Sequence, residues 1–446
     1  MGKELFGTDG IRGVAGEYPL DRATVFAFGV ALGRDVLRTH GASEVLIGAD
    51  TRESAGWISQ IAAGGLERGG VRVRYAGVIT TPGIAYLTRK GPFAAGVMIS
   101  ASHNPYRDNG LKVFGHSGFK LPDDEEHAIE QEIFRLREQN LQSTESALSV
   151  DESLAGEYLD YLAGTCSTRF DGLRIVLDCG NGASFRLAPE LFRRLGAQVE
   201  ALCIEPDGRN INLNCGALHI EPLQHAVVEE RADAGVAFDG DADRAIFVSS
   251  SGREVNGDGV LLASARALKS AGHLAGNLVV STVMANLGLE KALEREGIRM
   301  IRTPVGDKYV LEEMVRLGAV LGGEQSGHVI FREYATTGDG MLTALRMMET
   351  ARRAGTGLDE LLDGLQIYPQ KVVNVRVREK KELTGLPSVA QEIRRAEEAF
   401  AGAGRVLVRF SGTEPLARVM VEGPDLERVD TFSRSIAEAI RMEMGA

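Results

Sequence analysis

An acidic segment, Asp239-Gly240-Asp241-Ala242-Asp243-Arg244, carries the most specific chemical signal in the sequence. It follows the apolar run Val236–Phe238 directly, and carboxylates two residues apart in an extended segment point the same way. Unit charges about 4 Å apart repel by about 4 kcal/mol at an effective dielectric constant near 20, so three carboxylates on one loop favour a bound cation. A set of oxygen ligands suits Mg²⁺. A solvated acidic turn is the alternative; an EF-hand loop is excluded, because Arg244 and Ser250 replace its Gly and Glu.

A serine turn, Ser100-Ala101-Ser102-His103-Asn104-Pro105, follows a second apolar run, Ala94–Ile99. A serine exposed at the end of a strand can accept and donate a phosphoryl group. Lys112 follows shortly and offers a cation for the same oxygens. The alternative is an ordinary turn that is closed by a side-chain cap.

Two further loops combine hydroxyl groups, glycine and charge. Arg409-Phe410-Ser411-Gly412-Thr413-Glu414-Pro415, with Arg418 beyond it, is typical of a phosphate-binding loop, although a hairpin with solvated charges is the competing interpretation. Gly323-Glu324-Gln325-Ser326-Gly327-His328 could bind sugar hydroxyls or an amine, with His328 as an acid or base, although a lone histidine is usually structural. Near the start, Phe6–Gly13 contains the glycine-flanked Arg12, which could equally be part of a simple turn.

The elements that position these loops follow a repeated pattern of apolar run, Gly/Asp turn and amphipathic helix. Val45–Asp50, a helix from about Ser54, and a strand at Val71–Tyr75 form a βαβ unit, which predicts parallel strands. The pattern returns at Ile175–Gly182 and at Leu278–Thr282, whereas alternating valines from Lys371 onward indicate a different, smaller unit.

We therefore expect an α/β protein with three similar α/β domains, which have mixed, largely parallel sheets, and a smaller C-terminal α+β domain, arranged around a central cleft. The expected domains carry the serine, the acidic, the sugar-binding and the phosphate-binding loop, in that order. Their boundaries are 1–149, 150–254, 255–368 and 369–446.

Composition excludes several classes of protein. The net charge is −12 without a Lys/Arg-rich run, which disfavours a nucleic-acid partner. No apolar run reaches the roughly 20 residues of a membrane helix, and the start lacks the apolar core of a signal peptide. The four cysteines have neither paired spacing nor a Cys-x-x-Cys motif, so we expect reduced thiols and a cytoplasmic location.

Taken in this order, the loops resemble the α-D-phosphohexomutase superfamily over essentially the whole chain. Within it, the chain is most similar to the bacterial branch that acts on glucosamine phosphate. Three features point to that branch besides Phe6–Gly13: Gln325, the segment Thr336–Gly340, and the segment Pro206–Asn212. Ala217 departs from the pattern, because many relatives have a small hydroxylated residue there.

The resemblance implies roles for individual residues. Ser102 would be the phosphoserine, and a phosphate oxygen on it would join Asp239, Asp241 and Asp243 around Mg²⁺. Arg12, His103 and Lys112 would surround the transferred group, with Lys112 and His328 as candidates for acid–base work. The residues implied in substrate binding are Glu324, Gln325 and Ser326 for the sugar, and Arg409, Ser411, Gly412, Thr413 and Arg418 for the phosphate that is not reacting.

The implied reaction interconverts glucosamine 6-phosphate and glucosamine 1-phosphate through a 1,6-bisphosphate, a step toward amino-sugar nucleotides and cell-wall precursors. The same chemistry on mannose or glucose phosphates is the nearest alternative, and a phosphosugar-binding protein without turnover is a more distant one. P-loop kinase chemistry is excluded, because no Gly-x-x-x-x-Gly-Lys-Ser/Thr segment is present. The sequence does not determine the oligomeric state, and a homodimer is compatible with it.

Overall fold

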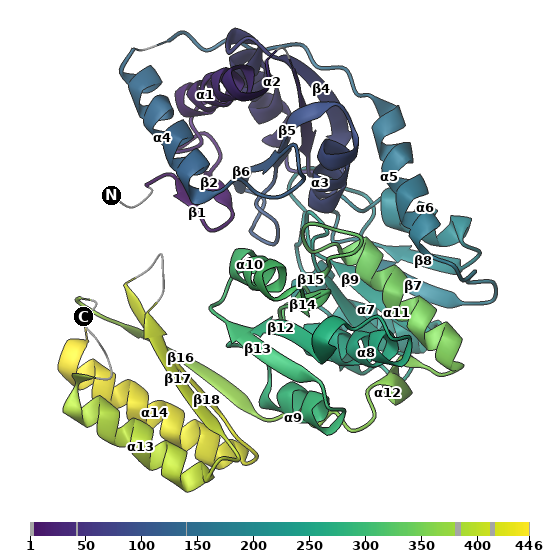
Figure 1. Ribbon diagram of the computed structural model, residues 1–446, viewed down its shortest axis with the longest axis vertical. Helices are drawn as coiled ribbons and strands as arrows, with labels where there is room; N and C mark the ends of the chain where they lie inside the picture. Colours follow the sequence, from purple (N-terminus) through teal and green to yellow (C-terminus); the bar gives the residue numbers. More distant parts are fainter. Residues whose placement is uncertain (1–3, 42, 140, 380–384, 411–414, 446) are drawn as a thin grey trace. The chain divides into compact units, whose positions relative to one another are not determined.

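The computed structural model describes residues 4–41, 43–139, 141–379, 385–410 and 415–445 (Figure 1). The chain forms two compact units. The first comprises Met1–Val283 and Ile301–Asp363, and the second comprises Met284–Met300 and Gly364–Ala446.

The first α/β domain is built on a six-stranded sheet with the order β1-β2-β6-β5-β3-β4. β3 pairs in parallel with β4 and β5, whereas β6, β2 and β1 continue the sheet in antiparallel pairs. The strands are β1 (Phe6–Gly7), β2 (Gly10–Val14), β3 (Glu44–Ala49), β4 (Arg72–Val78), β5 (Phe93–Ile99) and β6 (Asp108–Gly115). The helices are α1 (Arg22–His40), α2 (Ala55–Arg68), α3 (Thr81–Lys90) and α4 (Asp123–Glu138).

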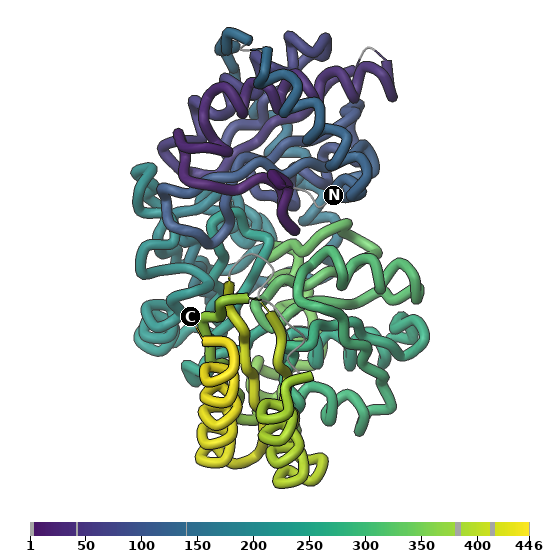
Figure 2. Tube along the Cα trace, turned by 90° about the vertical axis from the view of Figure 1, so that its left-hand side faces the viewer, coloured from purple at the N-terminus to yellow at the C-terminus, as the bar shows by residue number. Residues whose placement is uncertain are grey.

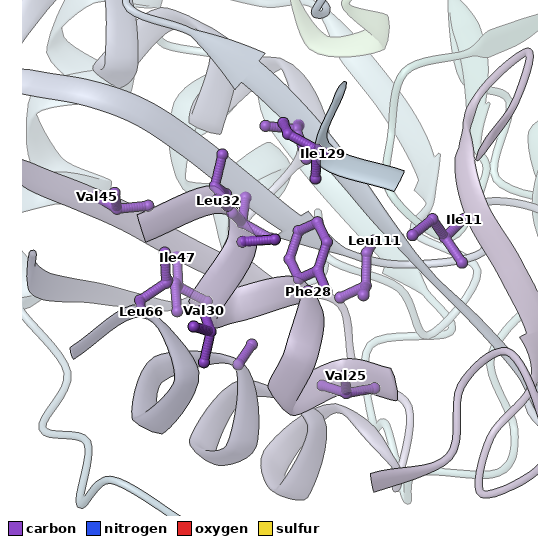
Figure 3. Close-up of a cluster of buried hydrophobic side chains, with 14 of the residues drawn as sticks. Ile11, Val25, Phe28, Val30, Leu32, Val45, Ile47, Leu66, Leu111 and Ile129 are labelled. Atoms are coloured by element: carbon purple, nitrogen blue, oxygen red, sulfur yellow. The ribbon is translucent and has the colours of Figure 1, made fainter. Parts of the chain in front are cut away.

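Successive side chains along each strand point to opposite faces of this sheet. Ile47 points into a core that α1, α2 and α4 share, and Figure 3 shows Phe28 and Leu32 of α1 in that core. On the opposite face, a Cβ on Gly48 or Gly96 would meet Ile84 of α3 at 2.5 or 2.9 Å. The expected βαβ unit is therefore present, with helices on both faces of the sheet.

The second domain has a five-stranded sheet with the order β11-β10-β9-β7-β8. β7 pairs in parallel with β8 and β9, and β10 turns back antiparallel to β9. The strands are β7 (Arg174–Asp178), β8 (Gln198–Leu202), β9 (Ala234–Phe238), β10 (Ala245–Ser249) and β11 (Glu254–Val255). The helices that precede or join them are α5 (Glu152–Thr165), α6 (Leu187–Arg194) and α7 (Glu221–Glu229).

The third sheet has the order β13-β12-β14-β15, with β12 parallel to β14 and β15 antiparallel to β14. Its strands are β12 (Leu278–Thr282), β13 (Arg299–Thr303), β14 (Leu321–Gly323) and β15 (Val329–Phe331). The associated helices are α8 (Gly257–Ser270), α10 (Asp307–Leu317), α11 (Gly340–Ala354) and α12 (Leu358–Leu361).

The second unit contains an antiparallel sheet with the order β16-β18-β17, and helices α13 and α14 lie side by side against it (Figures 1 and 2). Glu422 on β18 is fully buried, accepts the Leu287 amide at 2.9 Å and pairs with Arg405 at 2.7 Å. These contacts join residues 284–300 to the C-terminal sheet. The elements are α9 (Leu287–Arg295), β16 (Gln370–Arg376), α13 (Pro387–Phe400), β17 (Arg405–Phe410), β18 (Leu416–Glu422) and α14 (Leu426–Met444).

The predicted fold class is confirmed: the sheets of the three α/β domains are mixed, and the C-terminal part is smaller and different. The predicted domain boundaries stay predictions. Among the described residues, no helix is both long and apolar enough to cross a membrane.

Close packing of α1 on α2 generates a stability prediction. A Cβ on Gly29 would lie 2.3 Å from the Ala62 carbonyl oxygen and 2.9 Å from the Gly65 Cα, and neither backbone atom can move aside alone. We expect Gly29→Ala to destabilise the first domain by about 1 to 3 kcal/mol. Gly56→Ala is the control, because nothing lies within 4 Å of its Cβ and alanine favours the helix.

Differential scanning calorimetry of both variants tests this expectation. The Gly29→Ala transition should shift to lower temperature, while Gly56→Ala should match or exceed the wild type. Equal transitions for Gly29→Ala and the wild type would contradict the described packing.

Candidate functional site

Three aspartates lie on the turn between β9 and β10. Asp239, Asp241 and Asp243 are buried, and each offers an oxygen within 4.8 Å of the others. Ala242, between two of them, has a left-handed φ of 55°, which tightens the turn. The Oδ1 atoms of Asp241 and Asp243 are buried and have no hydrogen-bond partner among the described residues. Crowded carboxylates with unsatisfied oxygens fit a hard cation such as Mg²⁺.

The three carboxyl groups do not share one electrostatic environment. Burial, reinforced by the charges of Asp243 and Asp241, raises the pKa of Asp239 well above its usual range. Burial also acts on Asp243, but Lys112 and His328 outweigh it and lower the pKa of that carboxyl group. The turn therefore holds more negative charge than the neighbouring side chains neutralise, and a bound cation would relieve that excess.

Ser102 faces this turn from the end of β5. Its Oγ donates a hydrogen bond to Asp239 Oδ2 at 2.5 Å and lies 3.2 Å from Nδ1 of His103. Burial, and then the charges of Arg244 and Arg12, lower the pKa of His103 to about 4, so its ring is neutral near pH 7. The serine hydroxyl of the first domain thus meets the carboxylates of the second.

Arg52 stabilises the serine turn through hydrogen bonds. It follows β3, and its side chain is fully buried. Its Nη2 donates to the carbonyl oxygens of Ser102 and Asn104, both at 2.8 Å, and its Nη1 donates to that of Asp108 at 3.0 Å. Asp50 accepts from its Nε at 2.9 Å. Ser102 has a left-handed φ of 52°, which costs free energy for a residue other than glycine, and these bonds offset that cost.

Lys112, on β6, reaches the same turn. Its Nζ lies 2.8 Å from Asp241 Oδ2, 3.7 Å from Asp243 Oδ2 and 2.9 Å from Asp9 Oδ2. Burial alone would lower the pKa of Lys112, but these carboxylates raise it, so the side chain stays protonated. Arg12 donates to the same oxygen of Asp9, Oδ2.

His328 approaches from the third domain, at the start of β15. Its Nδ1 lies 3.5 Å from Asp243 Oδ2, and its Nε2 accepts the Gly338 amide at 2.9 Å. Burial opposes the charged ring, whereas nearby carboxylates, Asp243 first, raise the pKa. The Gly338 contact needs an unprotonated Nε2, and because that amide is fixed by the backbone, we assign a neutral ring with its proton on Nδ1.

The loop before His328 presents its side chains from a short hairpin between β14 and β15. The Glu324 amide donates to the His328 carbonyl oxygen at 2.9 Å, and Glu324 Oε1 accepts the Gly306 amide at 3.2 Å. Gln325 is half-buried and Ser326 is exposed. The hairpin thus leaves carboxylate, amide and hydroxyl groups available at its tip.

The C-terminal loop belongs to the second unit. Arg409 on β17 and Arg418 on β18 are cross-strand neighbours. Like charges directly opposite each other are destabilising, and burial together with Arg418 lowers the pKa of Arg409. An anion between them would remove this repulsion. The predicted Ser411, Gly412 and Thr413 lie outside the described residues.

The structure thus brings together Ser102, His103, Lys112, the three aspartates and His328 from three domains. Sequence reasoning missed Asp9, Arg52 and Arg244. Asp9 lies inside the glycine-flanked segment from which Arg12 was selected. Arg52 could have been found, because it follows β3, whose carboxyl end adjoins that of β5, and loops at that edge meet.

The support from Arg52 generates a prediction about the serine turn. Lysine keeps the charge but lacks the planar guanidinium group and its several N–H donors. Arg52→Lys should therefore lose at least two charge-assisted hydrogen bonds, each contributing about 1.5 to 3 kcal/mol. We expect the amides of residues 103, 104 and 106–108 to exchange hydrogen about 100-fold faster. Arg107→Lys is the control, because Arg107 is an exposed residue of the same turn. An unchanged rate of hydrogen exchange in Arg52→Lys would show that the turn does not depend on the guanidinium group of Arg52.

Comparison with known protein families gives four matches in chain order. Phosphoglucomutase/phosphomannomutase α/β/α domain I matches residues 3–140, domain II matches 156–252 and domain III matches 256–368. The phosphoglucomutase/phosphomannomutase C-terminal domain matches residues 372–439.

Whole-chain relatives agree with these matches. A phosphoglucosamine mutase of Solibacter usitatus is 74% identical over 445 residues, covering 100% of both chains, and one of Koribacter versatilis is 51% identical over 99% of this chain and 98% of its own. A phosphoglucomutase/phosphomannomutase family protein from Burkholderia thailandensis has a similar fold, with a TM-score of 0.79, 24% identity, and coverage of 98% of this chain and 97% of its own. Aspergillus fumigatus N-acetylphosphoglucosamine mutase, solved in complex with GlcNAc-6P and magnesium, has a TM-score of 0.67 at 16% identity, over 99% of this chain and 96% of its own. The chain therefore belongs to the phosphoglucosamine mutase family of the phosphohexomutases.

Proposed function

We propose that this chain interconverts glucosamine 6-phosphate and glucosamine 1-phosphate, with Ser102 as the residue that carries the phosphoryl group. The observation that supports this proposal most directly is the 2.5 Å contact between Ser102 Oγ and Asp239. In this contact the Ser102 hydroxyl, the proposed nucleophile, lies at the edge of a carboxylate cluster suited to Mg²⁺.

In the proposed reaction, the P–O bond to Ser102 Oγ breaks as a new bond forms to O1 of glucosamine 6-phosphate. The resulting 1,6-bisphosphate turns over, and its 6-phosphoryl group returns to Ser102 Oγ. The product, glucosamine 1-phosphate, therefore keeps the phosphoryl group that came from the enzyme. Such transfer depends on positioning and on neutralising charge more than on covalent chemistry.

The proposed cation ligands are Asp239, Asp241 and Asp243, with a phosphate oxygen on Ser102 as a further ligand. When bound, Mg²⁺ would supply charge stabilisation for the transferring phosphoryl group. Lys112 keeps its proton and so acts as a fixed positive charge and hydrogen-bond donor beside that group. Arg12 and the neutral His103 complete the surroundings. Proton transfer is proposed for His328, and Lys112 supplies charge rather than a proton.

Substrate contacts are proposed from two loops. Glu324, Gln325 and Ser326 would bind the sugar, because their hairpin presents groups that pair with hydroxyls and an amine. Arg409 and Arg418, together with the predicted residues 411–413, would bind the phosphate that is not reacting. The repulsion between the two arginines supports an anion there.

The same transfer on glucose or mannose phosphates is the competing activity. The 74% identity with a phosphoglucosamine mutase favours the amino sugar. A binding protein without turnover is disfavoured, because binding alone needs neither a serine nucleophile nor a carboxylate cluster. The cytoplasmic location expected from the sequence stays a prediction, and a homodimer stays compatible with the sequence.

Replacement of the serine tests the proposed function. Ser102→Ala should abolish mutase activity on glucosamine 6-phosphate, because no oxygen remains to carry the phosphoryl group. Intact-mass analysis should find one phosphate on the wild type and none on this variant. Ser117→Ala, which alters an exposed serine on the next turn, should keep both phosphate and activity. Phosphate retained on Ser102→Ala would refute the assignment.

Removal of one carboxylate tests the metal site. Asp241→Ala should lose Mg²⁺-dependent turnover and, in titration calorimetry, the binding of Mg²⁺ itself. Glu200→Ala, an exposed carboxylate of the same domain, should retain both. Removal of Mg²⁺ by a chelator should abolish the mutase activity of the wild type. Full activity after exhaustive chelation would contradict a metal-dependent reaction.

A further inference from the structure

Two ion pairs of opposite polarity lie side by side where the first domain meets the third. Lys120 and Asp123 come from the segment that leads into α4, and Asp307 and Lys308 begin α10. Lys120 Nζ lies 2.5 Å from Asp307 Oδ2, and Lys308 Nζ lies 2.6 Å from Asp123 Oδ1. Each domain therefore contributes one cation and one anion to the contact.

The two pairs differ in what surrounds them. The side chains of Lys120 and Asp307 are 16% and 18% exposed, whereas Asp123 is 68% exposed. Lys120 also has a second carboxylate partner, Asp9 Oδ1, at 2.6 Å. Lys120 is thus an ammonium group shared by two partly buried carboxylates, whereas Lys308 forms a pair at the solvent boundary.

Both carboxylates that Lys120 binds lie next to groups of the candidate site. The other oxygen of Asp9 is 2.9 Å from Lys112 Nζ, and Asp307 Oδ2 is 3.8 Å from His328 Nε2. Because Asp9 and Asp307 both lie within 2.6 Å of one nitrogen, loss of that charge would leave two carboxylates facing each other. Their separation would displace Lys112, which Asp9 binds, and would shift the start of α10 beside His328.

The backbone fixes where Lys120 lies. The turn before it contains Gly118, whose φ is 76° and whose Cβ would lie 2.6 Å from the Ala85 carbonyl oxygen. The Gly118 carbonyl oxygen accepts Thr336 Oγ1 of the third domain at 2.6 Å. Lys120 itself forms a β-bridge with Phe114. The ammonium group is therefore presented to Asp307 from a turn that is already anchored on both domains.

We propose that Lys120 is a positioning residue for phosphoryl transfer: by bridging Asp9 and Asp307, it aligns Lys112 of the first domain and His328 of the third around the reacting group. This inference rests on the proposed function, since it assumes that Lys112 and His328 act in that reaction. Lys120 touches neither the carboxylate cluster nor the serine in the described contacts, so its effect is exerted through the two aspartates. Lys308 makes a parallel contact without that connection.

The experiment compares the two lysines. Lys120→Met keeps the length and bulk of the chain but removes its charge, and we expect kcat to fall about 10- to 100-fold while KM changes less than about threefold. Lys308→Met is the matched control at the same contact and should keep kcat within about twofold. Lys120→Arg, which restores the charge, should recover at least part of the loss.

A double-mutant cycle separates positioning from general adhesion of the domains. The effects of Lys120→Met and Asp307→Asn on kcat should be strongly non-additive. Lys308→Met and Asp123→Asn, alone or together, should leave kcat unchanged. Circular dichroism and melting temperature identify any variant that fails to fold. If Lys120→Met does not fold, the comparison is made with Lys120→Arg and Asp307→Asn.

Two results would overturn the inference. The first is a wild-type kcat in Lys120→Met. The second is an equal loss of stability in Lys120→Met and Lys308→Met, with no change of kcat in either variant. An inactive wild-type enzyme would instead remove the proposed function, and this inference with it. If the wild type is active and Lys120→Met has the same kcat, this inference fails but the proposed function stands.

Discussion

The concentration of negative charge between β9 and β10 is the constraint on which the rest of the site depends. Three buried aspartates on one turn are unfavourable unless cations surround them. Lys112 from the first domain supplies such a cation, the neutral His328 from the third domain lies against the same turn, and Ser102 is hydrogen-bonded to it. The charge of one loop thus determines which groups of the other domains must meet there.

Each of these groups is delivered by the end of a strand. Ser102 follows β5 and the aspartates follow β9, both of which are central strands with parallel partners. In α/β sheets, loops at the carboxyl ends of such strands are the usual place for ligands. The left-handed residues Ser102 and Ala242 show that both loops turn sharply there, and Arg52 stabilises the serine loop from within the first domain. The serine loop is therefore held in its sharp turn by contacts within its own domain.

The sequence predicted the fold class and the family correctly, because the motifs are local in the chain and the βαβ pattern repeats. It also selected Ser102 and the aspartates from loops that the structure brings together, although their roles stay predictions. Partners distant in sequence were harder to find. Asp9 is a single acidic residue in a turn and Asp307 is the first residue of α10, and only the folded contacts with Lys112, Lys120 and His328 distinguish them. Mixed sheets were predicted, but the strands that pair antiparallel were not identified, since strands of either direction have similar apolar runs.

Transfer of label in a single turnover tests the central claim most directly. The enzyme would be prepared with a ³²P-labelled phosphoserine, mixed with a substoichiometric amount of unlabelled glucosamine 6-phosphate, and the products separated. The account predicts that label leaves Ser102 and appears at position 1 of the glucosamine 1-phosphate formed, while unlabelled phosphate from position 6 replaces it on the serine. Formation of unlabelled glucosamine 1-phosphate, with all label still on the protein, would contradict it.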